Sequence, residues 1–313
     1  MSSRLIADDL ARQIDRRVVS VEPIPAGHSG FTYFVETEPS HRYVLRLPPP
    51  GARIAATADV VRQGRIMASL HSAGLPTPAI PFMSGEPVVD GRPFILMEAI
   101  DGLRIEATSE REKPEDIAAA AVSVLKRLHA LPVEDSGIGE EEPTPLVADM
   151  MRWAMLMQRA PEELTTRAGE LGGMLAAQVP AERPPTLVHG DYHYGNMLFR
   201  GSEVVAVLDW EIAQIGQPLL DLGCLAIMSH RSQFKDAESP GGSVALPDAD
   251  LFALYGVDAQ EMNWYVAMSL YKYAAILGYN LMLHRRGKRP DPFYETLTTT
   301  ITGMIDEGVT LLS

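Results

Sequence analysis

Three polar residues near the middle of the chain have the types and spacing of a magnesium site. Asp191 follows a short apolar run, Asn196 lies five residues later, and Asp209 ends the apolar run at residues 204–208. A hairpin turning at Gly201 would return Asp209 to the side of Asn196. Two carboxylates and an amide oxygen around a small volume suit Mg²⁺, which takes few protein oxygens and completes its shell with water and substrate phosphates. The pattern therefore predicts metal-assisted chemistry on a phosphate.

Each of these pieces also has an ordinary structural interpretation when it is taken alone. A His-Gly-Asp tripeptide occurs in many loops, and Asp209 could cap the next turn. The combined spacing, the apolar run on either side and the downstream Asp221 favour a site. Two nearby residues have two interpretations each. Glu211 reaches a second metal through water or faces solvent, and His193 meets substrate or faces solvent.

The same residues resemble the aminoglycoside phosphotransferase and choline kinase superfamily, which shares the protein kinase fold. The resemblance rests on three motifs in the order of the chain: His189-Gly190-Asp191 with Asn196, Leu208-Asp209-Trp210-Glu211, and Pro218-Leu219-Leu220-Asp221-Leu222. It implies that Asp191 positions or deprotonates an acceptor hydroxyl and that Asn196 and Asp209 hold Mg²⁺ on the nucleotide phosphates. Phosphoryl transfer needs such positioning and charge neutralisation more than covalent chemistry. The resemblance gives His189 and Asp221 supporting roles, beneath the loop and on its backbone.

The first lobe of that superfamily binds the nucleotide, and this chain departs from its pattern at two positions. The resemblance puts Ser29 and Gly30 in the turn over the phosphates, where glycine allows close backbone approach. Arg46 stands where much of the superfamily has Lys, and Arg can grip a phosphate with two donors. Gln63 stands where the subgroup related to acyl-CoA dehydrogenase-fused kinase domains has Glu. It could accept a hydrogen bond from Arg46 without supplying charge, or be an exposed helix residue.

The strand that ends at Glu98 resembles the connector between the two lobes. In the superfamily, adenine is bound there through backbone groups. The resemblance therefore makes Glu98 and Ile100 candidates through their main chains and Met97 a wall of the nucleotide pocket. A backbone contact of this kind discriminates little between ATP and GTP.

Hydrophobic periodicity predicts the elements that must position these residues. Over about residues 20–100 the apolar residues alternate and turn residues punctuate them, which predicts a five-stranded sheet with one inserted helix at 55–73. Asp90-Gly91 is a strong hairpin signal between the last two strands. After residue 101 the period changes to that of helices. The predicted fold class is α+β, a two-lobed protein kinase-like fold with an N-terminal lobe at 1–100 and a mainly helical lobe at 101–313.

Further helices are expected in both lobes, and two short strands interrupt the second. The expected helices are an amphipathic one at 1–18 and others at 114–131, 145–158, 161–178, 258–284 and 292–312; the strands flank Gly201-Ser202 within 186–211. Surface loops are expected at 132–145 and 236–247, where acids, Pro, Ser and Gly gather.

The amino-acid composition argues against several classes of protein. The 313 residues carry 27 Lys and Arg against 41 Asp and Glu, a formal charge of −14 that opposes binding to nucleic acid or to an anionic membrane. Cys224 is the one cysteine, so an internal disulfide and a cysteine zinc cluster are excluded. The N-terminus lacks the unbroken apolar core of a signal peptide, and a cytoplasmic protein is expected.

The function expected from the motifs is an ATP- and Mg²⁺-dependent kinase that phosphorylates a hydroxyl of a small molecule. The alternative is a nucleotide-binding protein without efficient transfer, which the departure at Gln63 suggests. A protein kinase is disfavoured because an Asp-Phe-Gly segment is absent and no Ala-Pro-Glu segment follows Asp209, where the chain runs quickly into Pro218. The acceptor stays open between a hydroxylated acyl thioester and cationic antibiotics. Acidic clusters at 134–135, 140–142 and 162–163 would favour cationic acceptors if they border the cleft. The acceptor-lining candidates, each also a core candidate, are Trp153, Trp264, Tyr265, Tyr271, Tyr273 and Tyr279.

Overall fold

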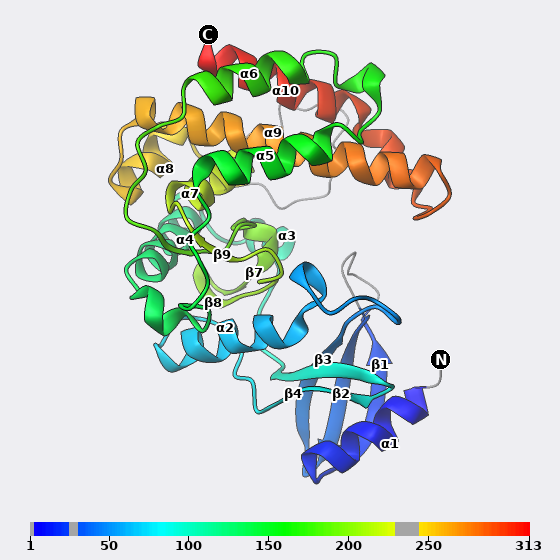
Figure 1. The fold of residues 1–313 in the computed structure, drawn as a ribbon. Helices are drawn as coiled ribbons and strands as arrows, with labels where there is room; N and C mark the ends of the chain where they lie inside the picture. The colour runs from blue at the N-terminus through cyan, green and yellow to red at the C-terminus, as the bar shows by residue number, and fades with distance from the viewer. Residues whose placement is uncertain (1–2, 25–30, 229–243) are drawn as a thin grey trace.

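Alternating apolar residues in the first hundred positions form a five-stranded antiparallel sheet, and a larger helical lobe follows it (Figure 1). The computed structural model describes residues 3–24, 31–228 and 244–313. The spatial order of the sheet is β1-β2-β3-β5-β4. Its strands are β1 (Arg17–Pro23), β2 (Phe31–Glu38), β3 (His41–Leu47), β4 (Phe82–Val89) and β5 (Arg92–Glu98). The predicted α+β class with a sheet lobe and a helical lobe is confirmed.

Helices pack on both sides of this sheet and build the second lobe. Those of the first lobe are α1 (Ser3–Ile14) and α2 (Val60–Ser72). Those of the second are α3 (Ile105–Thr108), α4 (Pro114–His129), α5 (Leu146–Met157), α6 (Ala168–Ala177), α7 (Leu219–Ile227), α8 (Asp248–Tyr255), α9 (Ala259–Arg285) and α10 (Thr298–Leu312). Within the described ranges, none of the helices combines the length and the apolar character that crossing a bilayer requires.

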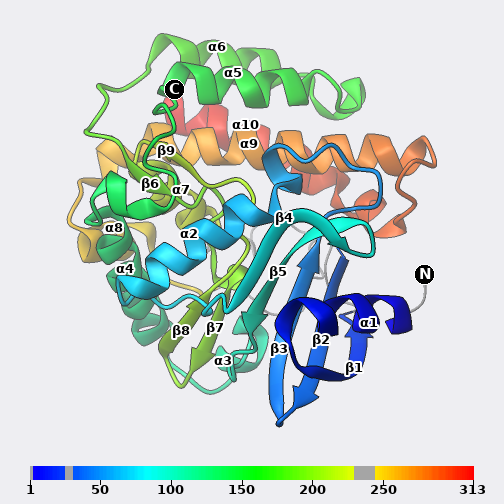
Figure 2. The ribbon, with the colours of Figure 1, turned by 60° about the horizontal axis from the view of Figure 1, so that its bottom comes forward.

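Strand β5 divides its side chains between two cores. Phe94 and Leu96 pack with α1 in a core of the sheet lobe, whereas Ile95 and Met97 join the large core that contains α2. Figure 2 shows α1 on one face of the sheet and α2 on the other. Arg46 of β3 pairs with Ile95 across the strands, and residues that pair directly share a face. Arg46 therefore points toward α2 and the second lobe.

Two small antiparallel strand pairs carry the central motifs of the second lobe. Strand β6 (Thr186–Val188) pairs with β9 (Gln214–Gly216), and β7 (Met197–Arg200) pairs with β8 (Glu203–Val207). The second pair is the hairpin expected around Gly201, which has a positive φ of 58°. The turn between β4 and β5 also forms as expected, with φ of 53° at Asp90 and 66° at Gly91.

The structure differs from the expected helices in several places. The segment 161–178 is a short 3-10 turn, Glu162–Leu164, followed by α6, because Thr165 leaves the helical conformation between them, with φ −118° and ψ 22°. The segment 292–312 likewise begins as a 3-10 turn before α10. Helices α7 and α8 were not expected. Helix α7 is buried on nearly all sides, so its sequence has no amphipathic period. The loop expected at 236–247 lies mostly outside the described residues.

The contact between α7 and α9 leaves no room for a side chain at Gly223. A Cβ there would lie 2.5 Å from the Tyr265 carbonyl oxygen. We expect Gly223→Ala to lower the free energy of unfolding by about 1–3 kcal/mol, because the helices must separate. Gly173→Ala on α6, where a Cβ meets nothing within 4 Å, is the matched control and should raise stability by about 0.5–1 kcal/mol. Urea unfolding measures both; equal stability of the two variants would contradict the argument.

Candidate functional site

The carboxylate of Asp221 holds the backbone of the His-Gly-Asp loop. Asp221 is fully buried at the start of α7, and its two oxygens accept hydrogen bonds from the His189 N–H at 2.7 Å and the Gly190 N–H at 2.8 Å. His129 of α4 approaches the same carboxylate at 3.3 Å. The structure thus has Asp221 in the supporting position that the resemblance implied.

Gly190 is required by the shape of this loop. Its φ is 81°, a left-handed conformation that favours glycine, and a Cβ there would lie 2.6 Å from the Ile212 carbonyl oxygen. Any side chain at this position would push the loop away from the Ile212 carbonyl, which lies just before β9.

His189 is a structural residue beneath the loop. Its Nδ1 accepts a hydrogen bond from the Asp191 N–H at 3.1 Å, and its Nε2 donates to the Leu208 carbonyl at 2.9 Å. The ring lies 4.4 Å from the Trp210 ring, centroid to centroid. Burial lowers the pKa of His189, so the imidazole is neutral and holds one tautomer. The ring therefore ties Asp191 to the backbone just before Asp209.

Asp191 is held by donors on both carboxylate oxygens. The Asn196 side-chain amide donates to Oδ2 at 2.9 Å and to the Asp191 carbonyl at 3.0 Å, and the Tyr273 hydroxyl donates to Oδ1. His193 Nε2 lies 3.4 Å from Oδ2. Burial alone would raise the pKa of Asp191, but His193, Lys272 and Tyr273 outweigh it and hold the pKa well below its ordinary value. The group is an oriented carboxylate ready to accept a hydrogen bond from a hydroxyl.

Two residues of α9 complete the surroundings of Asp191. Lys272 is buried, donates to the Gly190 carbonyl, and lies 5.2 Å from the centres of the Trp153 and Tyr273 rings. The Tyr273 hydroxyl lies 3.0 Å from the Cys224 sulfur, and burial raises the pKa of this thiol to about 12. Tyr273 was among the acceptor-lining candidates, but Lys272 was missed. A lysine in the apolar stretch of a long helix was the signal that could have found it.

The hairpin of β7 and β8 brings Asn196 and Asp209 together. The Leu208 N–H donates to the Asn196 carbonyl at 2.8 Å, and Asp209 follows with a φ of 66°, a strained conformation for a non-glycine residue. Because Asn196 uses its Nδ2 on Asp191, its amide oxygen faces away from that carboxylate. An amide oxygen just before β7 and a carboxylate just after β8 fit Mg²⁺, which needs few protein ligands.

Arg46 joins the sheet lobe to this pair of strands. Its two terminal nitrogens donate separately, to Asp209 at 3.0 Å and to Glu211 at 2.9 Å. Burial and the Asp209 carboxylate raise the pKa of Glu211 to about 7. Glu211 therefore does not face solvent, since it lies against the cation of the sheet lobe.

Gln63 does not make the contact with Arg46 that the sequence suggested. Its amide nitrogen donates to the Thr57 carbonyl at 3.0 Å, and its amide oxygen has no hydrogen-bond partner among the described residues. The interpretation of Gln63 as an exposed helix residue is also wrong, because it is 1% exposed. The side chain points inward from α2 against the preceding 3-10 turn. Its amide nitrogen therefore bonds to a backbone carbonyl and not to Arg46.

The connector residues lie where β5 leaves the sheet. Met97 is buried in the large core, and the N–H groups of Glu98 and Ala99 donate to the carbonyls of Ala79 and Arg42. The predicted binding of a nucleotide by Met97, Glu98 and Ile100 stays a prediction. Ser29 and Gly30 lie outside the described residues.

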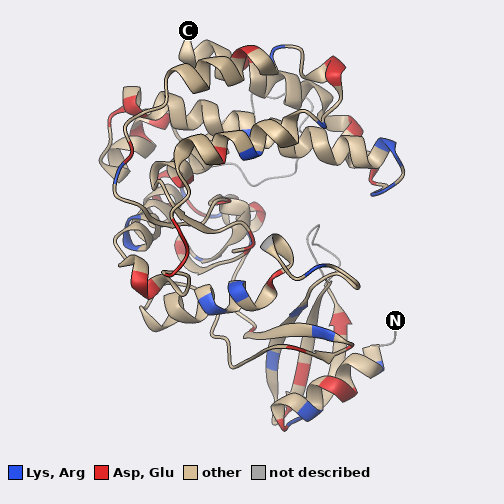
Figure 3. Cartoon of the chain, in the orientation of Figure 1, with Lys and Arg blue, Asp and Glu red and all other residues tan. Residues whose placement is uncertain are grey.

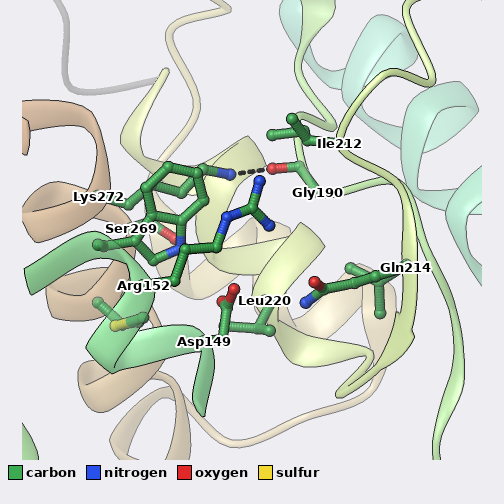
Figure 4. A pocket seen from close by; sticks show the side chains of 11 residues that line it. Asp149, Arg152, Gly190, Ile212, Gln214, Leu220, Ser269 and Lys272 are labelled. Carbon is green, nitrogen blue, oxygen red and sulfur yellow. Dashed lines mark hydrogen bonds between the residues drawn. The ribbon is translucent and has the colours of Figure 1, made fainter. Parts of the chain in front are cut away.

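A pocket opens beside the His189-Gly190-Asp191 loop, between α5 and α9 (Figure 4). The pocket is open to solvent, and both polar and apolar side chains line it. Figure 4 shows Arg152 and Lys272 directed toward Gly190, with Asp149 and Gln214 on the opposite side. Other lining residues are Trp153, Val188, Ile212, Leu220, Met268 and Ser269.

The acidic clusters that were considered as a border of the acceptor cleft do not line this pocket. Glu141 pairs with Arg62 at 2.6 Å and Glu163 pairs with Arg285 at 2.6 Å. Acidic and basic residues are distributed over both lobes (Figure 3). The excess negative charge therefore gives no argument for a cationic acceptor in this pocket.

Comparison with known sequences finds a family and a group of longer relatives. A model of the phosphotransferase enzyme family (APH) matches residues 20–265, which include Arg46 and the His189-Gly190-Asp191 loop. Acyl-CoA dehydrogenase family member 10 of Mus musculus is 28% identical over 272 residues, with 80% of this chain and 25% of that protein covered. Family member 11 of Rattus norvegicus is 27% identical over 283 residues, with 83% and 36% covered. The chain thus spans a quarter to about a third of these relatives.

Solved structures share the fold over nearly the full length. A Ralstonia eutropha JMP134 protein classed with the aminoglycoside phosphotransferases superposes with a TM-score of 0.80 at 21% identity, covering 99% of this chain and 98% of that chain. A thermostable mutant of aminoglycoside phosphotransferase APH(4)-Ia, in ternary complex with AMP-PNP and hygromycin B, gives 0.69 at 15% identity, with 98% of each chain covered. These matches confirm the kinase-like fold and the resemblance to the acyl-CoA dehydrogenase-linked subgroup.

Proposed function

Because the chain belongs to the phosphotransferase enzyme family, we propose that it is a small-molecule kinase that uses ATP and Mg²⁺ to phosphorylate a hydroxyl. The observation that carries this proposal is the oriented carboxylate of Asp191, hydrogen-bonded at 2.9 Å to Asn196, whose strand leads back to Asp209. Solved relatives hold AMP-PNP or ADP, which supports nucleotide binding at the corresponding place.

In the proposed reaction each residue has a distinct task. Asp191 accepts the hydrogen bond of the acceptor hydroxyl and directs its oxygen at the γ-phosphorus. The new O–P bond forms as the bond to the β–γ bridging oxygen breaks, and the hydroxyl proton passes to Asp191 or onward to solvent. Asn196 and Asp209 would hold Mg²⁺, which neutralises charge on the phosphates, and Arg46 would add its donors to them. Tyr273 and Asn196 keep the Asp191 carboxylate in one orientation.

We place the acceptor in the pocket beside Gly190. Its lining offers two cations, Arg152 and Lys272, one carboxylate, Asp149, and the amide of Gln214. Such a lining suits a polar acceptor that both donates and accepts hydrogen bonds. This lining does not favour a hydroxylated acyl thioester over a cationic antibiotic, nor the reverse.

The second candidate is a nucleotide-binding protein without efficient transfer. The inward turn of Gln63, which leaves Arg46 without a partner on α2, is the observation that favours it. The two candidates separate in one assay, because both bind nucleotide and only the kinase releases the diphosphate with an acceptor present.

A coupled assay of ADP release tests the proposal. The acceptor panel contains hydroxyacyl-CoA thioesters, aminoglycosides, macrolides, choline, homoserine and sugars, and Asp209→Ala is the blank. GTP is tested alongside ATP, since the structurally similar aminoglycoside 2'-phosphotransferase-IIIa was solved as a GDP complex. We expect acceptor-dependent release above the blank. Tight Mg²⁺-nucleotide binding without release across the panel would select the second candidate instead.

A further inference from the structure

We propose that Glu211 is the acid that orients Arg46 toward the nucleotide phosphates, in the place of the helix acid that this chain lacks. The inference rests on the proposed function, and it assigns Glu211 as a positioning residue. Sequence alone left this residue between a second metal ligand and a solvent-exposed side chain.

The geometry of the ion pair supports this role of Glu211. Arg46 Nη1 donates to Asp209 and Nη2 donates to Glu211, at 3.0 and 2.9 Å. The Arg46 side chain is 12% exposed and that of Glu211 is 22% exposed, so solvent screens the pair less than it screens a surface ion pair. A planar guanidinium can hold two carboxylates through separate nitrogens, whereas a lysine ammonium cannot fix that orientation.

The contact between Arg46 and Asp209 weakens when a nucleotide binds. In the proposed function Asp209 would give an oxygen to Mg²⁺, which competes with Nη1 of Arg46 for the negative charge of this carboxylate. The bond from Nη2 to Glu211 can persist, because it does not use the metal ligand. Glu211 would then hold one arm of the guanidinium while the other faces the phosphates.

In the described part of the chain, no acid other than Asp209 and Glu211 pairs with Arg46. The helix position is Gln63, which is uncharged and donates to Thr57 at 3.0 Å. Among the described residues, the ion pairs of Arg46 are those with Asp209 and Glu211. Once Asp209 is occupied, Glu211 is the remaining counter-charge. We therefore regard three residues as one arrangement and not as separate departures from the superfamily pattern: Arg46 in β3, Gln63 in α2 and Glu211 after Asp209.

Glu211→Gln separates this role from metal binding. Affinity for Mg²⁺-AMP-PNP, measured by titration calorimetry without acceptor, should fall about 10-fold, the usual size for loss of a charged hydrogen-bond partner. The Mg²⁺ concentration that gives half-maximal binding should stay unchanged, and Glu211→Asp should recover part of the affinity. Glu203→Gln, an exposed position on the same hairpin, is the matched control and should bind as the wild type does.

A double variant provides the decisive comparison. If Glu211 acts through Arg46, Glu211→Gln should add no further loss in an Arg46→Gln background. Additive losses, or a shift in the Mg²⁺ dependence with unchanged nucleotide affinity, would overturn the assignment. Thermal melts identify any variant that does not fold. Absence of nucleotide binding by the wild type would instead refute the proposed function, so the two failures are distinguishable.

Discussion

Asp191→Asn is expected to lower kcat by about 10²–10⁴-fold, the range for loss of a positioned acid–base group. The asparagine keeps the size of the side chain, and its amide oxygen can still accept from Asn196 or Tyr273, which hold the carboxylate in the wild type. It cannot take a proton or carry the negative charge that draws the acceptor hydroxyl into line. Steady-state kinetics with the acceptor identified by the ADP-release screen gives the value.

Nucleotide affinity should be nearly unchanged in the same variant. In the proposed function Asp191 serves the acceptor side of the site, and Asn196 and Asp209 are the proposed Mg²⁺ ligands. Asp116→Asn, an exposed residue on α4, is the matched control for a change of one charge and should retain wild-type turnover. Full activity of Asp191→Asn would remove this residue from the reaction.

The largest expected effect on stability comes from Asp221. We expect Asp221→Asn to lower the free energy of unfolding by about 2–5 kcal/mol. The wild-type carboxylate accepts from two N–H groups, at His189 and Gly190. An asparagine keeps one acceptor oxygen and turns a donating amide against the other N–H, which leaves a buried donor unsatisfied. Urea unfolding followed by circular dichroism measures the change.

The loop that depends on Asp221 should also lose order before the rest of the chain unfolds. In Asp221→Asn, hydrogen exchange at His189 and Gly190 should speed up more than exchange in β3, whose hydrogen bonds are elsewhere. Asp116→Asn again serves as the control, with stability within about 0.5 kcal/mol of the wild type. A wild-type unfolding curve for Asp221→Asn would show that the backbone does not need the carboxylate.

Local patterns in the sequence predicted most of the architecture. The five strands were found because their apolar residues alternate and turns such as Asp90-Gly91 separate them. The proximity of Asn196 to Asp209 followed from a hairpin encoded within about a dozen residues. Helix α7 was missed because it is buried on nearly all sides and has no polar face to set a period.

The contacts that complete the site could not be predicted in this way. Tyr273 reaches Asp191 from 82 positions along the chain, and Arg46 reaches Glu211 across 165 positions. No spacing rule relates residues so far apart, because the first contact depends on how α9 packs within the second lobe and the second contact depends on how the two lobes pack. Gln63 shows the same limit, since only the turn at Thr57 decides which way its amide points.

The alternation of side chains along β5 also determines how the molecule unfolds. Phe94 and Leu96 belong to one core and Ile95 and Met97 to the other, so neither core can open without exposing a face of the same strand. A fragment that ends at residue 100 would leave the apolar side of α2 in water, at a cost of about 25 cal/mol for each Å² exposed. The two lobes are therefore joined into one cooperative unit, and the full chain should melt in a single transition.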